Sequence, residues 1–151
     1  MRVIAGKLKA MQLVAPEGKD TRPTADRARE SLFNVLEHGK YSRILRSANV
    51  VDVFAGTGAL GIEAISRGAS SATFFERDSK ALAALSANIK KTKMDDLCKI
   101  VQSDALHPQS PQIACDVLFF DPPYYLDLTT QSVAAFAQMG WMAEDSLSII
   151  Q

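Results

Sequence analysis

The sequence predicts an α/β fold in which a parallel sheet carries helices on both of its faces. Short apolar runs alternate with helical segments of about ten residues along most of the chain, as in successive strand–helix units. One run, residues 117–120 (VLFF), has no polar position, which is typical of a strand buried on both sides. With 151 residues and 47% hydrophobic content, the chain can form one domain with a sizeable core.

The amino-terminal part is predicted to form a hairpin followed by a helix. Residues 2–5 and 10–14 are expected to be two short strands joined around Gly6-Lys7. Thr24 is a suitable N-cap for a helix that runs to about His38. Its apolar face is predicted from the helical spacing of Ala28, Leu32, Val35 and Leu36.

The remaining elements follow as alternating strands and helices. A glycine, Gly68, is expected to close one helix, and Ser79 is expected to cap the next. The predicted elements are a strand at 49–54, a helix at 59–67, a strand at 71–76, a helix from Ser79 whose face holds Leu82, Leu85 and Ile89, strands at 98–102 and 115–120, a helix at 128–138 and an apolar run at 147–150.

Two parts of the chain are distinguished by this pattern. Residues 1–20 are predicted to be a β-hairpin extension, and residues 21–151 the main α/β domain. Because the last apolar run is reached only at 147–150, we expect the sheet to lack its final strands and to expose an apolar edge.

Charge and cysteine content narrow the cellular context. Residues 1–50 hold ten Lys and Arg against five Asp and Glu, although the whole chain has a formal net charge of zero. This favours a polyanionic partner at one end, and a solvated charged face is the equally weighted alternative. Cys98 and Cys115 lack metal-ligand or disulfide spacing and are expected to be reduced core residues. The sequence shows no signal-peptide pattern at its start and no apolar run of membrane length, so we expect a cytoplasmic protein without membrane contact. We also expect a monomer and no metal site.

A glycine turn after the first sheet strand is the predicted cofactor site. Gly56, Gly58 and Gly61 fit G-x-G-x-x-G, and Glu76 follows Gly56 by twenty residues, which matches a dinucleotide fingerprint. A structural role for the glycines alone accounts for many such matches. Asp52 argues against a pyrophosphate and for a ligand that carries a sulfonium or ammonium charge, such as S-adenosylmethionine.

Glu76 is then expected to bind the ribose diol, and Asp104 the adenine. For Asp104, a loop Asx-turn is the equal alternative. The full set predicted for the cofactor is Asp52, Phe54, Ala55, Gly56, Thr57, Gly58, Glu76, Asp104 and Ala105.

The predicted catalytic turn is Asp121-Pro122-Pro123-Tyr124, directly after the buried strand. Two prolines offer carbonyls but no N–H groups, so this turn accepts hydrogen bonds and donates none from Pro122 or Pro123. Such a turn suits a planar exocyclic amino group, which needs an acceptor for each hydrogen and a ring to stack on it. Asp121 and the Pro122 carbonyl would accept the two hydrogens, and Tyr124 would stack. A simple Pro-Pro stop after a core strand is the alternative.

Three stretches resemble the RsmD-type methyltransferases of bacterial small-subunit ribosomal RNA, a family of class I methyltransferases. They are residues 22–34 (RPTADRARESLFN), 54–64 (FAGTGALGIEA) and 121–124 (DPPY). The resemblance implies a Rossmann-like class I sheet and methylation of the exocyclic N2 of a guanine in 16S ribosomal RNA. It also implies S-adenosylmethionine as donor, with S-adenosylhomocysteine as product. The partner it implies is small-subunit ribosomal RNA or the assembling 30S subunit.

The RNA-binding candidates are Lys7, Lys9, Arg22, Thr24 and Arg27. The last three open the first helix and would hold an RNA phosphate or form a lid over the cofactor, and for the two arginines a solvated basic helix end is the equal alternative. The hairpin departs from the family, whose usual Gly-Lys-Trp-Arg-Gly-Arg-Lys-Leu is replaced by GKLKAMQL at 6–13, so we expect weaker RNA contacts there. Relatives also continue for several tens of residues. The alternatives are an amino-group methyltransferase acting on DNA adenine or cytosine or on protein glutamine, a nicotinamide-dependent dehydrogenase, and a shortened, non-catalytic RNA-binding relative.

Overall fold

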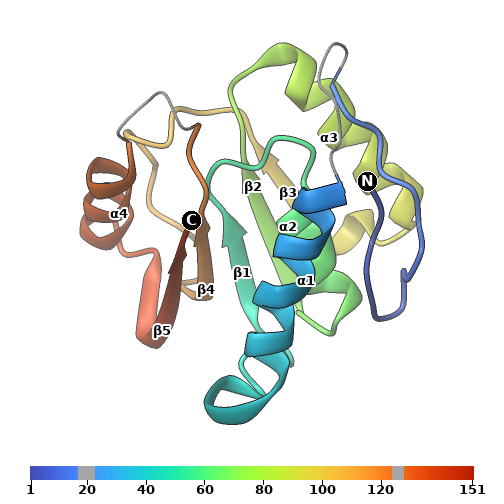
Figure 1. Cartoon of the computed structure of the whole chain (residues 1–151). Coiled ribbons are helices and arrows are strands. Elements are labelled where there is room, and N and C mark those ends of the chain that lie inside the picture. The colour runs from blue at the N-terminus through green and yellow to red at the C-terminus, as the bar shows by residue number, and fades with distance from the viewer. Residues whose placement is uncertain (17–22, 124–127) are drawn as a thin grey trace.

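A five-stranded parallel sheet forms the centre of the computed structural model, which describes residues 1–16, 23–123 and 128–151. The strand order is β3-β2-β1-β4-β5 (Figure 1). The elements are α1 (Pro23–Glu37), η1 (Gly39–Tyr41), β1 (Asn49–Asp52), α2 (Ala59–Ser66), β2 (Ser71–Phe75), α3 (Ser79–Thr92), η2 (Asp95–Leu97), β3 (Cys98–Val101), β4 (Cys115–Phe120), α4 (Thr129–Gln138) and β5 (Met142–Ile150). No helix in the described ranges is both long enough and apolar enough to cross a membrane.

Two hydrophobic layers cover the sheet, one on each face, as the sequence predicts. The first contains side chains of α1, α2 and α3 packed on Val50, Phe74 and Phe119 of the strands. The second is built mainly from α4 and from Trp141, packed on strand residues such as Phe75 and Leu118. Helices therefore lie on both faces, with α4 apart from the other three (Figure 1). Cys115 is buried and Cys98 half-buried, and both are free thiols.

Helix α1 differs from its prediction at its start and in its buried face. It begins at Pro23, so Thr24 lies in the first turn and is not the N-cap; proline suits this first position because its φ is fixed near the helical value. Ala28 is exposed and Val35 is 59% exposed. Leu36 is buried as predicted and Leu32 packs against the core, while Arg29 and Phe33 complete the buried face.

Helix α3 also begins differently from its prediction. Asp78 is the N-cap, and its carboxylate accepts a hydrogen bond of 2.9 Å from the Ala81 N–H, so Ser79 is the first helical residue. An extended residue with a carboxylate oxygen satisfies the free N–H groups of the first turn, and here Asp78 has that geometry. Leu85 and Ile89 are buried as predicted.

Residues 1–14, called the N-terminal segment below, form two antiparallel arms that do not become regular strands. The arms share one isolated bridge, between Arg2 and Gln12, supported by hydrogen bonds such as Val3 N–H to the Met11 carbonyl (2.9 Å). The prediction of regular strands at 2–5 and 10–14 is therefore wrong, although the chain does follow the path of a hairpin. The segment instead obtains many of its hydrogen bonds from α2 and α3, which satisfy backbone groups that a regular ladder would have satisfied.

The carboxyl-terminal half contains one further departure, at β5. The connection between β3 and β4 holds no helix, and none was predicted there; it contains Pro108 and Pro111, which disfavour a helix. Strand β5 starts at Met142, five residues earlier than predicted, because its pairing with β4 shifts register between Cys115 and Val117. Only the last part, Leu147–Ile150, pairs regularly with β4, and this is the part that the sequence pattern predicts.

Candidate active site

Three acidic residues gather at the carboxyl ends of neighbouring strands. Asp52 ends β1, Glu76 directly follows β2 and Asp121 directly follows β4. Because β1 lies between β2 and β4 in a parallel sheet, these residues meet at one edge. Open α/β sheets bind ligands at this edge, where the strand order reverses. The structure thus brings together two predicted cofactor residues and one predicted catalytic residue.

The glycine turn between β1 and α2 is shaped by two glycines with left-handed backbone angles. Gly56 has φ of 55° and Gly58 has φ of 85°. A Cβ on Gly58 would lie 2.5 Å from Leu85 of α3, and one on Gly61 would lie 2.3 Å from the Phe74 ring. A Cβ on Gly56 would meet nothing within 4 Å, so this part of the turn faces open space that a ligand can approach.

Asp52 is buried, with 1% of its surface exposed, and its carboxylate is only half satisfied. Oδ2 accepts a hydrogen bond of 3.2 Å from the Gly61 N–H, and Oδ1 has no partner among the described residues. Burial, together with the negative charges of Asp121 and Glu76, raises the pKa of Asp52 to about 7 against the lowering effect of the Gly61 hydrogen bond. A buried, unpartnered carboxylate fits a cationic ligand and disfavours an anionic pyrophosphate.

This burial predicts a pH-dependent stability that Asp52→Asn should remove. Because folding raises the pKa of Asp52 from 3.8 to about 7, the contribution is greatest below about pH 4 and is lost as the pH rises towards 7. The cofactor-free wild type should therefore lose about 2–3 kcal/mol between pH 5 and pH 8 through Asp52. Unfolding by urea at both pH values measures this. The exposed control Asp95→Asn should keep the wild-type difference, and an Asp52→Asn protein that keeps it too would contradict the assignment.

Glu76 and Asp104 already hold backbone groups of their own loops. One oxygen of Glu76 accepts the Gly56 N–H at 2.8 Å, and the other accepts the Arg77 and Asp78 N–H groups. Asp104 Oδ1 accepts the Leu106 N–H at 2.9 Å, which is the Asx-turn left open by the sequence. This hydrogen bond lowers the pKa of Asp104. Ala105, beside it, is buried, and Phe54 is half-buried in the α4-side layer.

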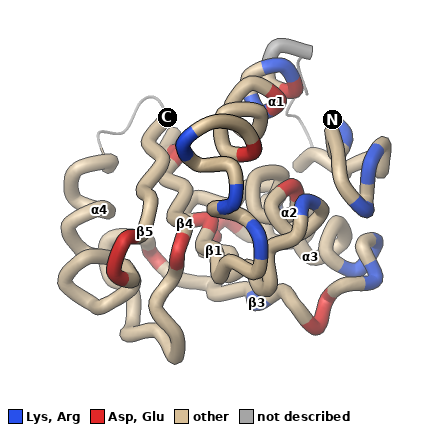
Figure 2. Tube along the Cα trace, turned by 90° about the horizontal axis from the view of Figure 1, so that it is seen from below, with Lys and Arg blue, Asp and Glu red and all other residues tan. Residues whose placement is uncertain are grey.

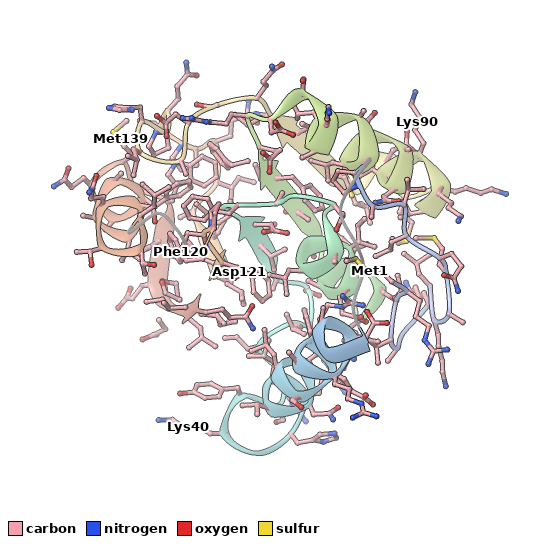
Figure 3. All side chains as sticks on the ribbon, turned by 45° about the horizontal axis from the view of Figure 1, so that its top comes forward. Met1, Lys40, Lys90, Phe120, Asp121 and Met139 are labelled. Atoms are coloured by element: carbon pink, nitrogen blue, oxygen red, sulfur yellow. The ribbon has the colours of Figure 1, made fainter. Side chains whose placement is uncertain are left out.

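The predicted catalytic turn begins at Asp121, which reaches solvent while burial raises the pKa of its carboxyl. Figure 3 shows Asp121 beside Phe120 at the end of β4, and Met1 to the right of them beside α2. Pro123 is exposed and Pro122 half-buried. The stacking role predicted for Tyr124 falls outside the described residues, as does the role of Arg22.

Part of the RNA-binding set lines one hollow of about 460 Å³ between the N-terminal segment and the first turns of α1. Lys9 and Arg27, both exposed, meet there with Arg2, while Asp26 and Glu30 contribute negative charge. Figure 2 shows Lys and Arg positions along the N-terminal segment and at α1, and Asp and Glu positions near β4 and β5. Lys7 is exposed on the same segment but does not line the hollow.

Sequence reasoning missed a buried ionic cluster behind this site. Glu63 is fully buried in α2 and accepts hydrogen bonds from the Ile4 and Ala5 N–H groups at 2.8 and 3.2 Å. It also pairs with Arg29 at 3.5 Å and Arg67 at 3.1 Å. The signal available in the sequence was a single acid inside the apolar stretch 59–66. Arg29, from the basic block that resembles the family, is therefore a core residue.

Solved structures share this fold along nearly the whole chain. The yhhF protein of Escherichia coli is 33% identical with a TM-score of 0.83, covering 99% of this chain and 79% of that one. The HI0767 protein of Haemophilus influenzae is 29% identical with a TM-score of 0.77, again covering 99% and 79%. The parallel five-stranded sheet with helices on both faces is the fold of class I methyltransferases.

Sequence comparison then gives the family. The family model described as Conserved hypothetical protein 95 matches residues 1–151. The Ribosomal RNA small subunit methyltransferase D of Escherichia coli (strain K12) is 32% identical over 152 residues, covering 100% of this chain and 74% of its own length. The chain belongs to this family, the RsmD family.

Proposed function

We propose that this protein transfers a methyl group from S-adenosylmethionine to the exocyclic N2 of a guanine in small-subunit ribosomal RNA. The observation that carries the proposal is the meeting of Asp52, Glu76 and Asp121 at one sheet edge, next to an acceptor-rich proline turn. Relatives named as ribosomal RNA small subunit methyltransferases support the substrate class. Family resemblance supports the guanine N2 position.

The cofactor, when bound, supplies an electrophilic methyl group on a sulfonium. The unpartnered Oδ1 of Asp52 is suited to its positive charge, and the open side of Gly56 gives it room. Glu76 can still accept a hydrogen bond from a ribose hydroxyl. A carboxylate has about four lone-pair sites, and backbone N–H groups occupy three of them here, which leaves one free. Asp104 and Ala105 would lie at the adenine end.

The catalytic turn would orient the amino nitrogen. An aromatic amine is a poor nucleophile, since its lone pair is delocalised into the ring. Asp121 and the Pro122 carbonyl, each accepting one N–H, would direct that lone pair towards the methyl group. As positive charge develops on the nitrogen, the Asp121 carboxylate stabilises it more than it stabilises the uncharged amine, and this lowers the barrier.

The decisive experiment compares ribosomal RNA nucleosides from a wild-type strain and a deletion strain by mass spectrometry. Loss of one N2-methylguanosine, restored by the intact gene and not by the Asp121→Ala gene, is the expected result. Purified protein should then methylate either 16S RNA or 30S particles from the deletion strain. Unchanged N2-methylguanosine would remove the guanine assignment, and labelled DNA or protein would support the other amino-group acceptors. Stabilisation by NAD and not by S-adenosylhomocysteine would indicate a dehydrogenase.

The hollow between the N-terminal segment and α1 predicts electrostatic RNA binding. The double variant Lys9→Ala/Arg27→Ala should weaken RNA binding and reduce the slope of log affinity against log salt by about 1.4–1.8, since each lost phosphate contact contributes about 0.7–0.9. Filter binding at several salt concentrations measures the slope. Lys40→Ala, in η1 beyond the far end of α1 (Figure 3), is the control and should keep the wild-type slope. An unchanged slope in the double variant would exclude this hollow as an RNA contact.

A further inference from the structure

Asn88 of α3 joins two segments that are far apart in the sequence. Its Nδ2 donates to the Val14 carbonyl and to the Thr57 carbonyl, both at 2.9 Å, and its Oδ1 accepts the Val14 N–H at 2.7 Å. The side chain is 0% exposed. Both amide hydrogens of this buried side chain are therefore used, and losing either bond leaves a carbonyl without its protein partner.

The Thr57 carbonyl belongs to the glycine turn of the candidate cofactor site. Its hydrogen bond to Asn88 fixes the peptide plane between Thr57 and Gly58, whose φ of 85° and contact with α3 make the turn tight. The Thr57 hydroxyl also lies 3.5 Å from the sulfur of Met1. The side of the turn that faces away from open space is thus held by α3 and by the N-terminal segment.

The N-terminal segment is docked at its other end by α2. Ser66 Oγ accepts the Leu8 N–H at 2.9 Å and donates to the Ala5 carbonyl at 2.5 Å. Of the side chains on α2 and α3 that bind the segment's backbone, Asn88 is the one that also binds the turn. Among the described contacts, Asn88 and the Met1–Thr57 contact are therefore the polar links between the segment and the cofactor turn.

We propose that Asn88 is a positioning residue that couples the docking of the N-terminal segment to the cofactor turn. With the segment docked, Asn88 holds the turn in the shape that receives the cofactor, and cofactor binding in return tightens the segment, because such coupling is reciprocal. The inference rests on the proposed function, since the turn must bind S-adenosylmethionine. It gives the cofactor a means of ordering the surface that carries Lys7 and Lys9 before RNA binds.

Hydrogen exchange in the full chain, with and without saturating S-adenosylhomocysteine, tests the coupling. Wild-type protein should show at least about fivefold slower exchange at Val3, Leu13 and Val14 when the ligand is bound. The Cys115 amide, which bonds the Trp141 carbonyl on the other face, should not change. Unchanged exchange throughout the segment, with the ligand bound, would overturn the inference and leave the proposed function intact. Failure of the ligand to bind would count against the proposed function itself.

Two variants separate this coupling from general stability. Asn88→Asp keeps the shape but places an oxygen against two carbonyl oxygens, so it should abolish the ligand-induced slowing and raise the cofactor KM about tenfold with kcat within twofold. Ser66→Ala removes two hydrogen bonds of the same segment without touching Thr57, so its ligand-induced slowing should persist. Equal slowing in Asn88→Asp and wild type would overturn the proposal. If Asn88→Asp does not fold, Asn88→Ser, which removes the amide hydrogens without adding a charge, takes its place in the same comparison.

Discussion

An Asp121→Ala protein should bind S-adenosylhomocysteine as the wild type does and methylate RNA about 10²–10³ times more slowly. The reason is that Asp121 directly follows β4, next to β1, and reaches solvent, whereas Asp52 is buried. Under the proposed function the target base would enter from solvent, and the Asp121 carboxylate would meet charge that develops on the amino nitrogen and is absent from the bound substrate. Calorimetry gives the affinity, and single-turnover transfer of labelled methyl gives the rate.

Two isosteric variants, Asp121→Asn and Asp116→Asn, separate the role of Asp121 from the loss of one negative charge near β4. Asp121→Asn keeps a carbonyl acceptor without the charge and should lie between the wild type and Asp121→Ala in rate. Asp116→Asn, near the opposite end of β4, keeps an acceptor for the Asn49 N–H. It should turn over within about twofold of the wild type, because only interactions that are stronger in the transition state than in the bound substrate change the rate of the chemical step. Near-normal methylation by Asp121→Ala would exclude Asp121 from catalysis.

Glu63→Ala should be the most destabilising single change at the buried ionic cluster. It leaves the guanidinium groups of Arg29 and Arg67, whose side chains are 5% and 2% exposed, without their shared buried carboxylate. Removing one partner of a buried pair costs about 3–5 kcal/mol. For a chain of this size the melting temperature should fall by about 10 °C or more. Thermal unfolding followed by circular dichroism measures the shift.

Glu37→Gln is the control, because Glu37 pairs with the same Arg67 at 2.8 Å but is 36% exposed. An ion pair that is partly exposed contributes about 0–1 kcal/mol, so this variant should melt within about 3 °C of the wild type. Equal losses in the two variants would show that burial of the carboxylate is not what makes Glu63 important. Glu63→Gln should lie between them, since the amide keeps one acceptor.

The sequence predicted the strands well wherever they are buried on both faces. The predicted limits of β4 agree with the observed ones, because a short apolar run between polar stretches is typical of a strand buried on both faces. The glycine turn was recognisable for a similar reason: glycine adopts left-handed angles at the least cost, and only glycine leaves room for the close contacts with Leu85 and Phe74. The strand-end placement of Asp52, Glu76 and Asp121 then follows from parallel topology alone.

The errors in the predicted helix faces arise where polar side chains, and not the expected apolar ones, are buried in the interior. The buried face of α1 was predicted from Ala28, Leu32, Val35 and Leu36, of which Leu36 is buried and Leu32 packs against the core. Ala28 and Val35 are exposed, and a periodic pattern cannot show that Arg29 is buried by a carboxylate on another helix. Asn88 likewise interrupts the face between Leu85 and Ile89, and its partners lie 31 and 74 residues away. Pairings of that kind depend on the tertiary structure, and spacing along a helix does not contain them.

The docking of the N-terminal segment has a consequence for the order of folding. Its hydrogen bonds to Glu63, Ser66 and Asn88 span 58 to 74 residues, so each closes a long loop before it contributes any stability. During synthesis these first residues emerge long before their partners on α2 and α3. The segment should therefore attach late, after the sheet has formed, and changes within it should accelerate unfolding more than they slow folding. A segment that is made well before its partners is then among the last to reach its final place.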